Sequence, residues 1–168
     1  FYKPGQEIAQ IEDWDERILA IAKRAREWDI GAITGIPTWT ELMIKKVIEY
    51  NNARTIHDIW PNLAVYSSGG VAFDTYEKSF NELVARPLVI IDTYLASEGF
   101  MAFQERPETR SMRLVTDNGI YFEFVPFKEE YIEEDGSLVQ DAPIVELGDV
   151  KEGEDYVLII STVAGLWR

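Results

Sequence analysis

The sequence predicts an α/β fold: a parallel βαβ sheet with helical crossovers, followed by an antiparallel β-hairpin extension. In the first half, short apolar runs alternate with segments of helical periodicity, an order typical of parallel strands joined by helices. Beyond Pro107 the helical pattern stops, and strand-like runs flank turn residues instead. We therefore expect residues 1–108 to form an α/β part and residues 109–168 to form an antiparallel extension of the same domain.

Two helices are expected in the first fifty residues. Across residues 11–28, apolar side chains recur at helical spacing, and acidic residues precede basic ones in the order that suits the helix dipole. A second helix should cover residues 38–50. Thr38 and Glu41 stand three residues apart, which is the spacing of a capping box at the start of a helix.

A third helix is expected between two of the apolar runs. Asp74 and Glu77 are its predicted cap, and Pro87 closes it because proline cannot continue a helix. The apolar runs themselves have the length of buried strands, and they cover residues 30–33, 63–66 and 88–91.

The second half contains four strand-like runs, which we expect to form two hairpins: residues 112–116 with 120–127, and residues 144–147 with 156–163. Asp117-Asn118-Gly119 separates the first pair and is a strong hairpin signal, because Asn and Gly accept the left-handed conformations of a tight turn. The acidic residues 129–135 are expected to form a solvated loop.

Composition excludes several classes of protein. The 168 residues are 46% hydrophobic, which supplies a core and argues against global disorder. Acidic residues number 30 against 16 basic ones, whereas a nucleic-acid-binding surface needs an excess of Lys and Arg. There is no cysteine, so disulfides, thiolate nucleophiles and cysteine zinc sites are excluded.

The sequence also bears on the cellular location of the protein and on whether the chain is complete. No apolar run approaches the roughly 20 residues that a membrane span requires, so we expect no membrane association and take the cytoplasm as the default. The sequence starts Phe1-Tyr2-Lys3-Pro4, without an initiator Met or a signal-peptide pattern, and stops soon after a strand-like run. Both ends therefore look cut from a longer chain.

Ligands of open parallel sheets usually bind beyond the carboxyl ends of the strands. Three such ends are expected to converge here: Thr34-Gly35, Ser67-Ser68-Gly69-Gly70, and residues 92–99. The glycine pair allows the backbone to approach a flat ring or a phosphate closely, because glycine has no Cβ. The alternative is a tight strand-to-helix turn without a ligand, and a bare glycine pair does not decide between the two.

The segment after the third predicted strand offers three kinds of ligand chemistry. An adenine can stack on Tyr94, a phosphate oxygen can accept a hydrogen bond from Ser97, and Glu98 can hold Mg²⁺. The alternative is again structural, namely a turn whose exposed glutamate caps the next segment.

Several segments occur in one order with compatible spacing: GIPTWTEL from Gly35, IWPNLAVYSSGGVAFDTYEKSF from Ile59, DTYLASEGFMAFQ from Asp92, GIYFEFVP from Gly119 and TVAGLWR from Thr162. With these motifs the chain resembles the acyl-acid amido synthetases of the auxin-responsive Gretchen Hagen family, within the adenylate-forming superfamily. The resemblance covers nearly the whole chain. It implies that the chain is part of the N-terminal domain of an adenylate-forming enzyme, with residues 1–108 as the nucleotide- and acyl-binding part.

The resemblance also implies roles for individual residues. Tyr94 would flank the adenine, Ser97 would face the α-phosphate during catalysis, and Glu98 would help the reaction by coordinating Mg²⁺. Ser68-Gly69-Gly70 would lie along the adenine and the acyl carboxylate. Leu95-Ala96 stands where the family often has Gly and Ser, so the loop departs from the family pattern between the chemical residues.

The implied reaction has two steps. The carboxylate of a small acid attacks the α-phosphate of Mg-ATP, and an amine, expected to be an amino acid, then attacks the acyl-AMP and releases AMP. Positioning and charge neutralisation would supply most of the catalysis. The family's phosphate loop lies upstream, and its Tyr-Arg-x-Gly-Asp motif would continue past Trp167-Arg168. We therefore expect the chain to be inactive without the remainder of its parent chain.

Two other functions stay open from the sequence. One is an acid-CoA ligase of the same superfamily, in which CoA replaces the amine. The other is a non-catalytic module that binds a nucleotide or an acyl group. His57, the only histidine, stands in an irregular stretch and is expected to have a structural or surface role. Six aromatic residues could wall an acyl pocket, although alternating aromatics in strands are more typical of a core: Phe100, Phe103, Tyr121, Phe122, Phe124 and Phe127.

Overall fold

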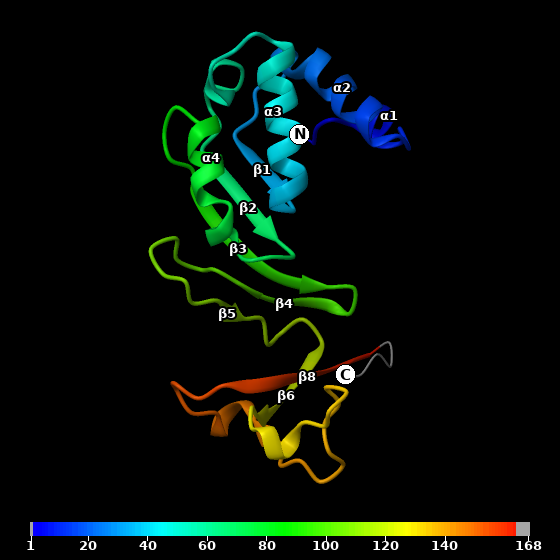
Figure 1. Ribbon diagram of the computed structural model, residues 1–168, viewed down its shortest axis with the longest axis vertical. Helices are drawn as coiled ribbons and strands as arrows, with labels where there is room; N and C mark the ends of the chain where they lie inside the picture. The colour runs from blue at the N-terminus through cyan, green and yellow to red at the C-terminus, as the bar shows by residue number, and fades with distance from the viewer. Residues whose placement is uncertain (1, 164–168) are drawn as a thin grey trace. The chain divides into compact units, whose positions relative to one another are not determined.

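The computed structural model describes residues 2–163, and Figure 1 names its helices and strands. The chain divides into two compact units, Phe1–Tyr94 with Ala102–Arg113 and Leu95–Met101 with Leu114–Arg168. A five-stranded sheet has the order β1-β2-β3-β4-β5, and a three-stranded sheet has the order β7-β6-β8. The predicted α/β class is confirmed. The first unit ends at Arg113 and leaves out Leu95–Met101, which belongs to the second unit.

The first unit contains the α-helices α1 (Gln6–Ala9), α2 (Trp14–Arg24), α3 (Pro37–Tyr50) and α4 (Glu77–Leu83), and the 3-10 turns η1 (Ala25–Glu27), η2 (Ile56–Asp58) and η3 (Phe73–Thr75). The first predicted helix is α2, which continues into η1. It begins later than predicted because Asp13 caps it, with its Oδ1 accepting a hydrogen bond from the Glu16 N–H at 2.8 Å.

Both predicted side-chain caps of the next two helices are wrong. α3 begins at Pro37 and not at the capping box of Thr38 and Glu41. Proline has a fixed φ and no N–H, so it suits the first position of a helix and moves Thr38 inside the first turn. Asp74 does not cap α4, because it lies in η3 and pairs with Arg110 at 2.7 Å.

The strands β1 (Ala32–Gly35), β2 (Val65–Gly69) and β3 (Val89–Ala96) pair in parallel, as predicted, and β4 (Gly99–Phe103) and β5 (Arg113–Leu114) complete the sheet. Each parallel strand continues beyond the apolar run that predicted it. Thr34-Gly35, residues 67–69 and residues 92–96 are therefore strand and not loop. The reason is that an apolar run marks where a strand is buried, whereas its backbone ladder also extends through polar residues.

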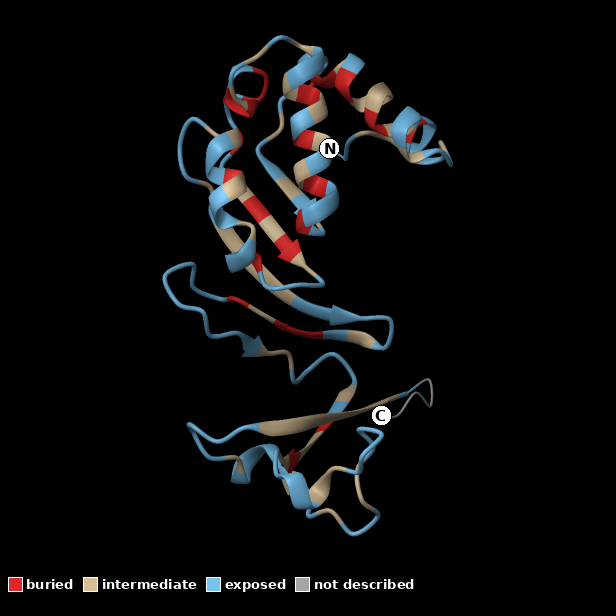
Figure 2. Cartoon of the chain, in the orientation of Figure 1, coloured by how far each residue is buried: buried red, intermediate tan, exposed pale blue. Residues whose placement is uncertain are grey.

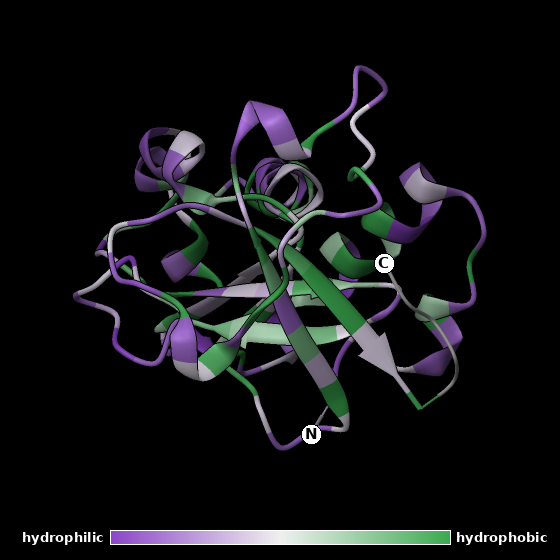
Figure 3. Ribbon diagram, turned by 90° about the horizontal axis from the view of Figure 1, so that it is seen from below, coloured by the Kyte–Doolittle hydropathy of each residue, from purple (hydrophilic) through white to green (hydrophobic). Residues whose placement is uncertain are grey.

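An aromatic cluster packs η3 and α4 against this sheet. Tyr66 of β2 is fully buried, and its ring stacks on Phe80 with centroids 5.0 Å apart and meets Phe73 edge-on at 5.5 Å. Phe73 and Phe80 also contact each other edge-on at 5.0 Å. Buried residues recur along β2, α2 and α3 in Figure 2, and Figure 3 shows hydrophobic residues along the strands and polar ones in many of the connecting loops.

His57 has a structural role, as expected. It is buried in η2, where its Nδ1 accepts a hydrogen bond from the Ala85 N–H at 3.0 Å and its Nε2 lies 2.9 Å from the Leu63 carbonyl oxygen. A backbone N–H can only donate, so the ring is the neutral tautomer with its proton on Nε2. The side chain thereby joins the segments on either side of β2.

In the second unit, β6 (Ile120–Pro126) is the central strand, with β7 (Val145–Glu146) and β8 (Tyr156–Thr162) antiparallel on its two sides. Both predicted hairpins are therefore wrong. The turn at Asp117-Asn118-Gly119 leads from β5 in one sheet to β6 in the other, although Gly119 has the expected positive φ of 81°. Phe122 and Val125 lie on opposite faces of β6 and both are buried, which favours a central place for this strand.

The acidic segment expected as a solvated loop is mostly exposed and contains the short turn η4 (Glu129–Tyr131). A second short turn, η5 (Leu147–Asp149), follows β7.

Replacing His57 with Ala should lower the free energy of unfolding of the complete protein by about 2 kcal/mol, because the Ala85 N–H and the Leu63 carbonyl lose a partner inside the fold. Urea denaturation followed by circular dichroism measures the change. Asn81→Ala on the exposed face of α4 is the control and should shift stability by about 0.5 kcal/mol or less. Equal midpoints for the two variants would contradict the structural role of His57.

Candidate functional site

The carboxyl ends of β1 and β2 lie side by side in the first unit, next to the middle of β3. Gly35 pairs with Ser68, and Ser68 pairs with Asp92 in the strand register. This is the edge at which ligands of open parallel sheets usually bind. The first two predicted strand ends and the start of segment 92–99 thus lie together in the structure, as predicted.

The turn after β2 has the geometry that the glycine pair predicts. Gly69 is the last residue of the strand, and Gly70 has a φ of 85°, a left-handed conformation that other residues adopt only with strain. A Cβ on Gly70 would lie 3.6 Å from the Ile36 side chain, so the glycine is needed for its conformation and not for lack of space. Gly70 and the two residues after it are exposed.

Ser68 is fully buried, unlike the turn that follows it. Its hydroxyl lies 3.5 Å from the Val71 carbonyl oxygen, and its own carbonyl accepts a hydrogen bond from the Thr93 hydroxyl at 2.7 Å. In this conformation the Ser68 side chain shapes the turn, and the surface available to a ligand is the backbone of Gly69 and Gly70.

The end of β1 is held closely against α3 and β2. A Cβ on Gly35 would come 2.8 Å from Thr40 Oγ1, so this glycine is required by space. The Gly35 carbonyl accepts a hydrogen bond from the Tyr66 hydroxyl at 2.7 Å. Burial raises the pKa of Tyr66 above its usual value, which keeps the hydroxyl protonated as the donor.

Tyr94 lies in β3, two residues after Asp92, so the two side chains share one face of the strand. The Tyr94 side chain is 50% exposed, which leaves part of its ring available for stacking. Sequence reasoning placed Tyr94 in a loop. The strand gives it a more regular backbone than that prediction assumed.

Ser97 and Glu98 form the two-residue turn between β3 and β4, and both are exposed. The eight-residue loop predicted here is therefore mostly strand, with only these two residues left as the turn. Gly99 follows, and a Cβ on it would come 2.6 Å from Ile120 Cδ1, so the turn is tightly packed against the start of β6. Ser97 and Glu98 belong to the second unit, whereas Gly69, Gly70 and Tyr94 belong to the first. Their convergence on one nucleotide pocket stays a prediction.

Between residues 2 and 163, no three His, Asp or Glu side chains gather closely enough to hold a metal ion by themselves. The exposed carboxylate of Glu98 is a donor of the kind that Mg²⁺ takes together with phosphate oxygens and water. Across the same residues, no helix combines the length and apolar character needed to cross a membrane.

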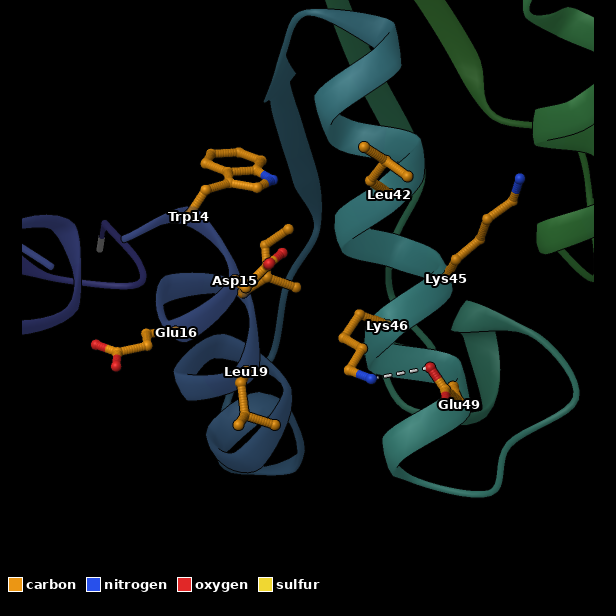
Figure 4. Close-up of a pocket in the computed structure, with 9 residues that line it drawn as sticks. Trp14, Asp15, Glu16, Leu19, Leu42, Lys45, Lys46 and Glu49 are labelled. Carbon is orange, nitrogen blue, oxygen red and sulfur yellow. Dashed lines mark hydrogen bonds and ion pairs between the residues drawn. The ribbon is translucent and has the colours of Figure 1, made fainter. Parts of the chain in front are cut away.

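A hollow that sequence reasoning missed lies between α2 and α3, with a volume of about 680 Å³ (Figure 4). Trp14, Leu19 and Leu42 contribute apolar surface to it. The lysines at its rim are engaged within α3: Lys46 pairs with Glu49 at 3.1 Å, and Lys45 pairs with Glu41. This hollow is formed by helix surfaces and not by the strand ends, so the site predicted from the motifs does not include it.

Known proteins resemble the chain in sequence and in fold. Residues 113–168 match the GH3 family central domain. Indole-3-acetic acid-amido synthetase GH3.4 of Arabidopsis thaliana is 30% identical over 136 residues, which cover 76% of this chain and 21% of that protein. Indole-3-acetic acid-amido synthetase GH3.2 of the same plant is 26% identical over 134 residues, which cover 76% of this chain and 24% of that protein. The chain thus spans about a quarter or less of the length of these relatives.

Among solved structures, the GH3.15 acyl acid amido synthetase has the same fold over 96% of this chain and 36% of its own, with a TM-score of 0.64 at 15% sequence identity.

Gly35→Ala should destabilise the complete protein by about 1–3 kcal/mol, because the new methyl group overlaps Thr40 Oγ1. In a Thr40→Ala background, where that oxygen is absent, the same substitution should cost clearly less. Thermal unfolding of the two single variants and the double variant measures this coupling. An identical cost in both backgrounds would show that the close approach does not constrain Gly35.

Proposed function

We propose, from the similarity of this chain to the GH3 family central domain and to proteins named as GH3 amido synthetases, that the complete protein activates a carboxylic acid with ATP and joins it to an amino acid. The observation that carries the proposal is the sheet edge of the first unit, where the left-handed Gly70 turn follows β2 and the half-exposed Tyr94 ring lies on the neighbouring strand β3. Similarity to proteins named indole-3-acetic acid-amido synthetases supports an acid and an amino acid as the substrate classes.

In the proposed first step, a carboxylate oxygen of the acid attacks the α-phosphorus of ATP. The bond to the β-phosphate oxygen breaks, pyrophosphate leaves, and acyl-AMP forms. The backbone of Gly69 and Gly70 would lie along the adenine and the acyl carboxylate, because the turn has no Cβ to keep a flat group away. Tyr94 would stack on the base from the neighbouring strand.

Ser97 and Glu98 are proposed to act at the phosphates. The Ser97 hydroxyl would donate a hydrogen bond to an α-phosphate oxygen, and the Glu98 carboxylate would ligate Mg²⁺ together with phosphate oxygens and water. When bound, Mg²⁺ neutralises negative charge that builds up on the transferred group. Both side chains stand exposed in a two-residue turn, so a phosphate can reach them without any side chain having to leave a core.

In the second step, the amine of the amino acid attacks the acyl carbonyl. The amide bond forms, the carbonyl–phosphate bond breaks, and AMP leaves with both electrons of that bond. The amine loses a proton in this step. The favourable leaving group lets positioning supply most of the rate, which suits a chain without cysteine and with its only histidine in a structural role.

The complete protein, incubated with ATP, Mg²⁺, a panel of small carboxylic acids and a panel of amino acids, tests the proposal. We expect acid-dependent exchange of pyrophosphate into ATP and a product with the mass of an acid–amino acid amide. An acyl-CoA product on addition of CoA would favour the ligase alternative. Nucleotide binding without exchange would favour a non-catalytic module.

Glu98→Gln in the complete protein should lower acid-dependent pyrophosphate exchange by about 10- to 1,000-fold, because the amide is a poorer ligand for Mg²⁺ than the carboxylate. Raising the Mg²⁺ concentration should recover part of the loss. Glu108→Gln removes another exposed carboxylate and should leave the exchange rate unchanged. If Glu98→Gln exchanges at the wild-type rate, this residue has no role at the metal.

Tyr94→Ala should raise the KM for ATP by about tenfold, since stacking on a base contributes about 1–3 kcal/mol. The KM for the acid should change much less, and Tyr94→Phe should stay close to wild type because it keeps the ring. Tyr121→Ala, which removes another exposed tyrosine, is the control. Equal increases in both KM values would argue against stacking on adenine.

A further inference from the structure

Asp92 is a side chain at the proposed site to which no role has been assigned. It lies in β3, directly beside Ser68 of β2 and two residues before Tyr94. One carboxylate oxygen, Oδ2, accepts a hydrogen bond from the Phe73 N–H at 3.4 Å. The other, Oδ1, is shielded from solvent and has no hydrogen-bond partner among the described residues.

The backbone of Asp92 is held firmly by one neighbour. The Gln104 side chain accepts a hydrogen bond from the Asp92 N–H at 3.0 Å, and the Gln104 N–H donates to the Asp92 carbonyl at 2.7 Å. Gln104 is itself buried, and its amide group donates to the carbonyls of Arg106, Pro107 and Thr109. The backbone that carries the Asp92 carboxylate is therefore held in place.

The segment that Asp92 contacts has few other attachments. Gly70, Val71 and Ala72 are exposed. Two side-chain hydrogen bonds to these residues are described: a long one of 3.5 Å from the Ser68 hydroxyl to the Val71 carbonyl, and one from the Thr75 hydroxyl to the Ala72 carbonyl. Phe73 is the next residue and begins η3. The Phe73 ring is held by Tyr66 and Phe80, and its N–H is held by Asp92, so this hydrogen bond orients the backbone at the point where the glycine turn ends.

A carboxylate is an unexpected choice if this position serves stability alone. A shielded carboxylate oxygen without a partner is unfavourable, and an apolar side chain of similar size would avoid that penalty. A side chain with an acceptor oxygen, however, can bind the Phe73 N–H, which an apolar side chain cannot do. An aspartate at position 92 is therefore explained better by its hydrogen bond to the turn than by a contribution to the stability of the core.

We infer that Asp92 is a positioning residue for the nucleotide: through the Phe73 N–H it fixes the turn of Gly69 and Gly70 relative to Tyr94. Asp92 does not touch the nucleotide, because its free oxygen is shielded. The inference rests on the proposed function, in which the same turn and the same ring bind ATP.

The anchoring itself is tested by hydrogen exchange of the complete protein without substrates. In Asp92→Leu, which is similar in size but cannot accept a hydrogen bond, amide exchange in residues 70–76 should be about threefold faster or more. Asp92→Asn keeps an oxygen for the Phe73 N–H and should exchange at close to the wild-type rate. If Asp92→Leu does not fold, Asp92→Ala takes its place. Wild-type exchange in the variant without an acceptor overturns the inference.

Kinetics of acid-dependent pyrophosphate exchange test the consequence for binding. Loss of one long hydrogen bond should raise the KM for ATP by about three- to tenfold in Asp92→Leu, with a smaller change in kcat and near-recovery in Asp92→Asn. A purely structural role would instead reduce the active fraction, lowering kcat and leaving KM unchanged. Asp74→Asn, which removes the exposed pair with Arg110 from the same turn region, should behave as wild type.

The outcomes separate the two proposals. Wild-type protein without acid-dependent exchange overturns the proposed function and the link from Asp92 to nucleotide binding with it. Active wild-type protein, together with an Asp92→Leu variant of unchanged KM, overturns the role of Asp92 alone.

Discussion

The parallel register of β1, β2 and β3 is the constraint on which the rest of the candidate site depends. Pairing Gly35 with Ser68 and Ser68 with Asp92 sets the ends of β1 and β2 beside the middle of β3. Each of these three places in the sheet then needs a different residue type. Gly35 has no room for a side chain, Gly70 needs a left-handed backbone, and Asp92 faces the end of the intervening turn. A shift of one residue in either pairing would turn the Tyr66, Ser68 and Asp92 side chains to the opposite face.

Much of this arrangement follows from the sequence because hydropathy reports burial. The apolar runs before Gly35, Ser67 and Asp92 located all three parallel strands, and the helical periodicity between them located the crossovers. Hydropathy does not report where backbone pairing stops. Residues 92–96, which begin with the polar pair Asp92-Thr93, continue β3 in the same ladder, so the long ligand loop that the sequence suggested contracts to the Ser97-Glu98 turn.

The second unit was less predictable for a different reason. Gly119 does have the left-handed φ that the motif Asp117-Asn118-Gly119 predicts, but a turn motif fixes only the local backbone and does not choose the strand's neighbour. That choice depends on β6 having a buried side chain on each face, Phe122 and Val125, which makes the inside of a sheet its favourable place. Likewise, the contact of Asp92 with Phe73 joins residues far apart in the chain, and no local pattern marks it.

Tyr66 couples the end of β1 to the helices that pack on the sheet. Its ring is packed between Phe73 and Phe80, while its hydroxyl holds the last carbonyl of β1. A rearrangement of this aromatic packing must therefore either break the hydroxyl contact or carry Gly35 along. A change of side chain at Phe80, on the helical side of this packing, is consequently expected to move the end of β1, because the Tyr66 ring and hydroxyl transmit the displacement.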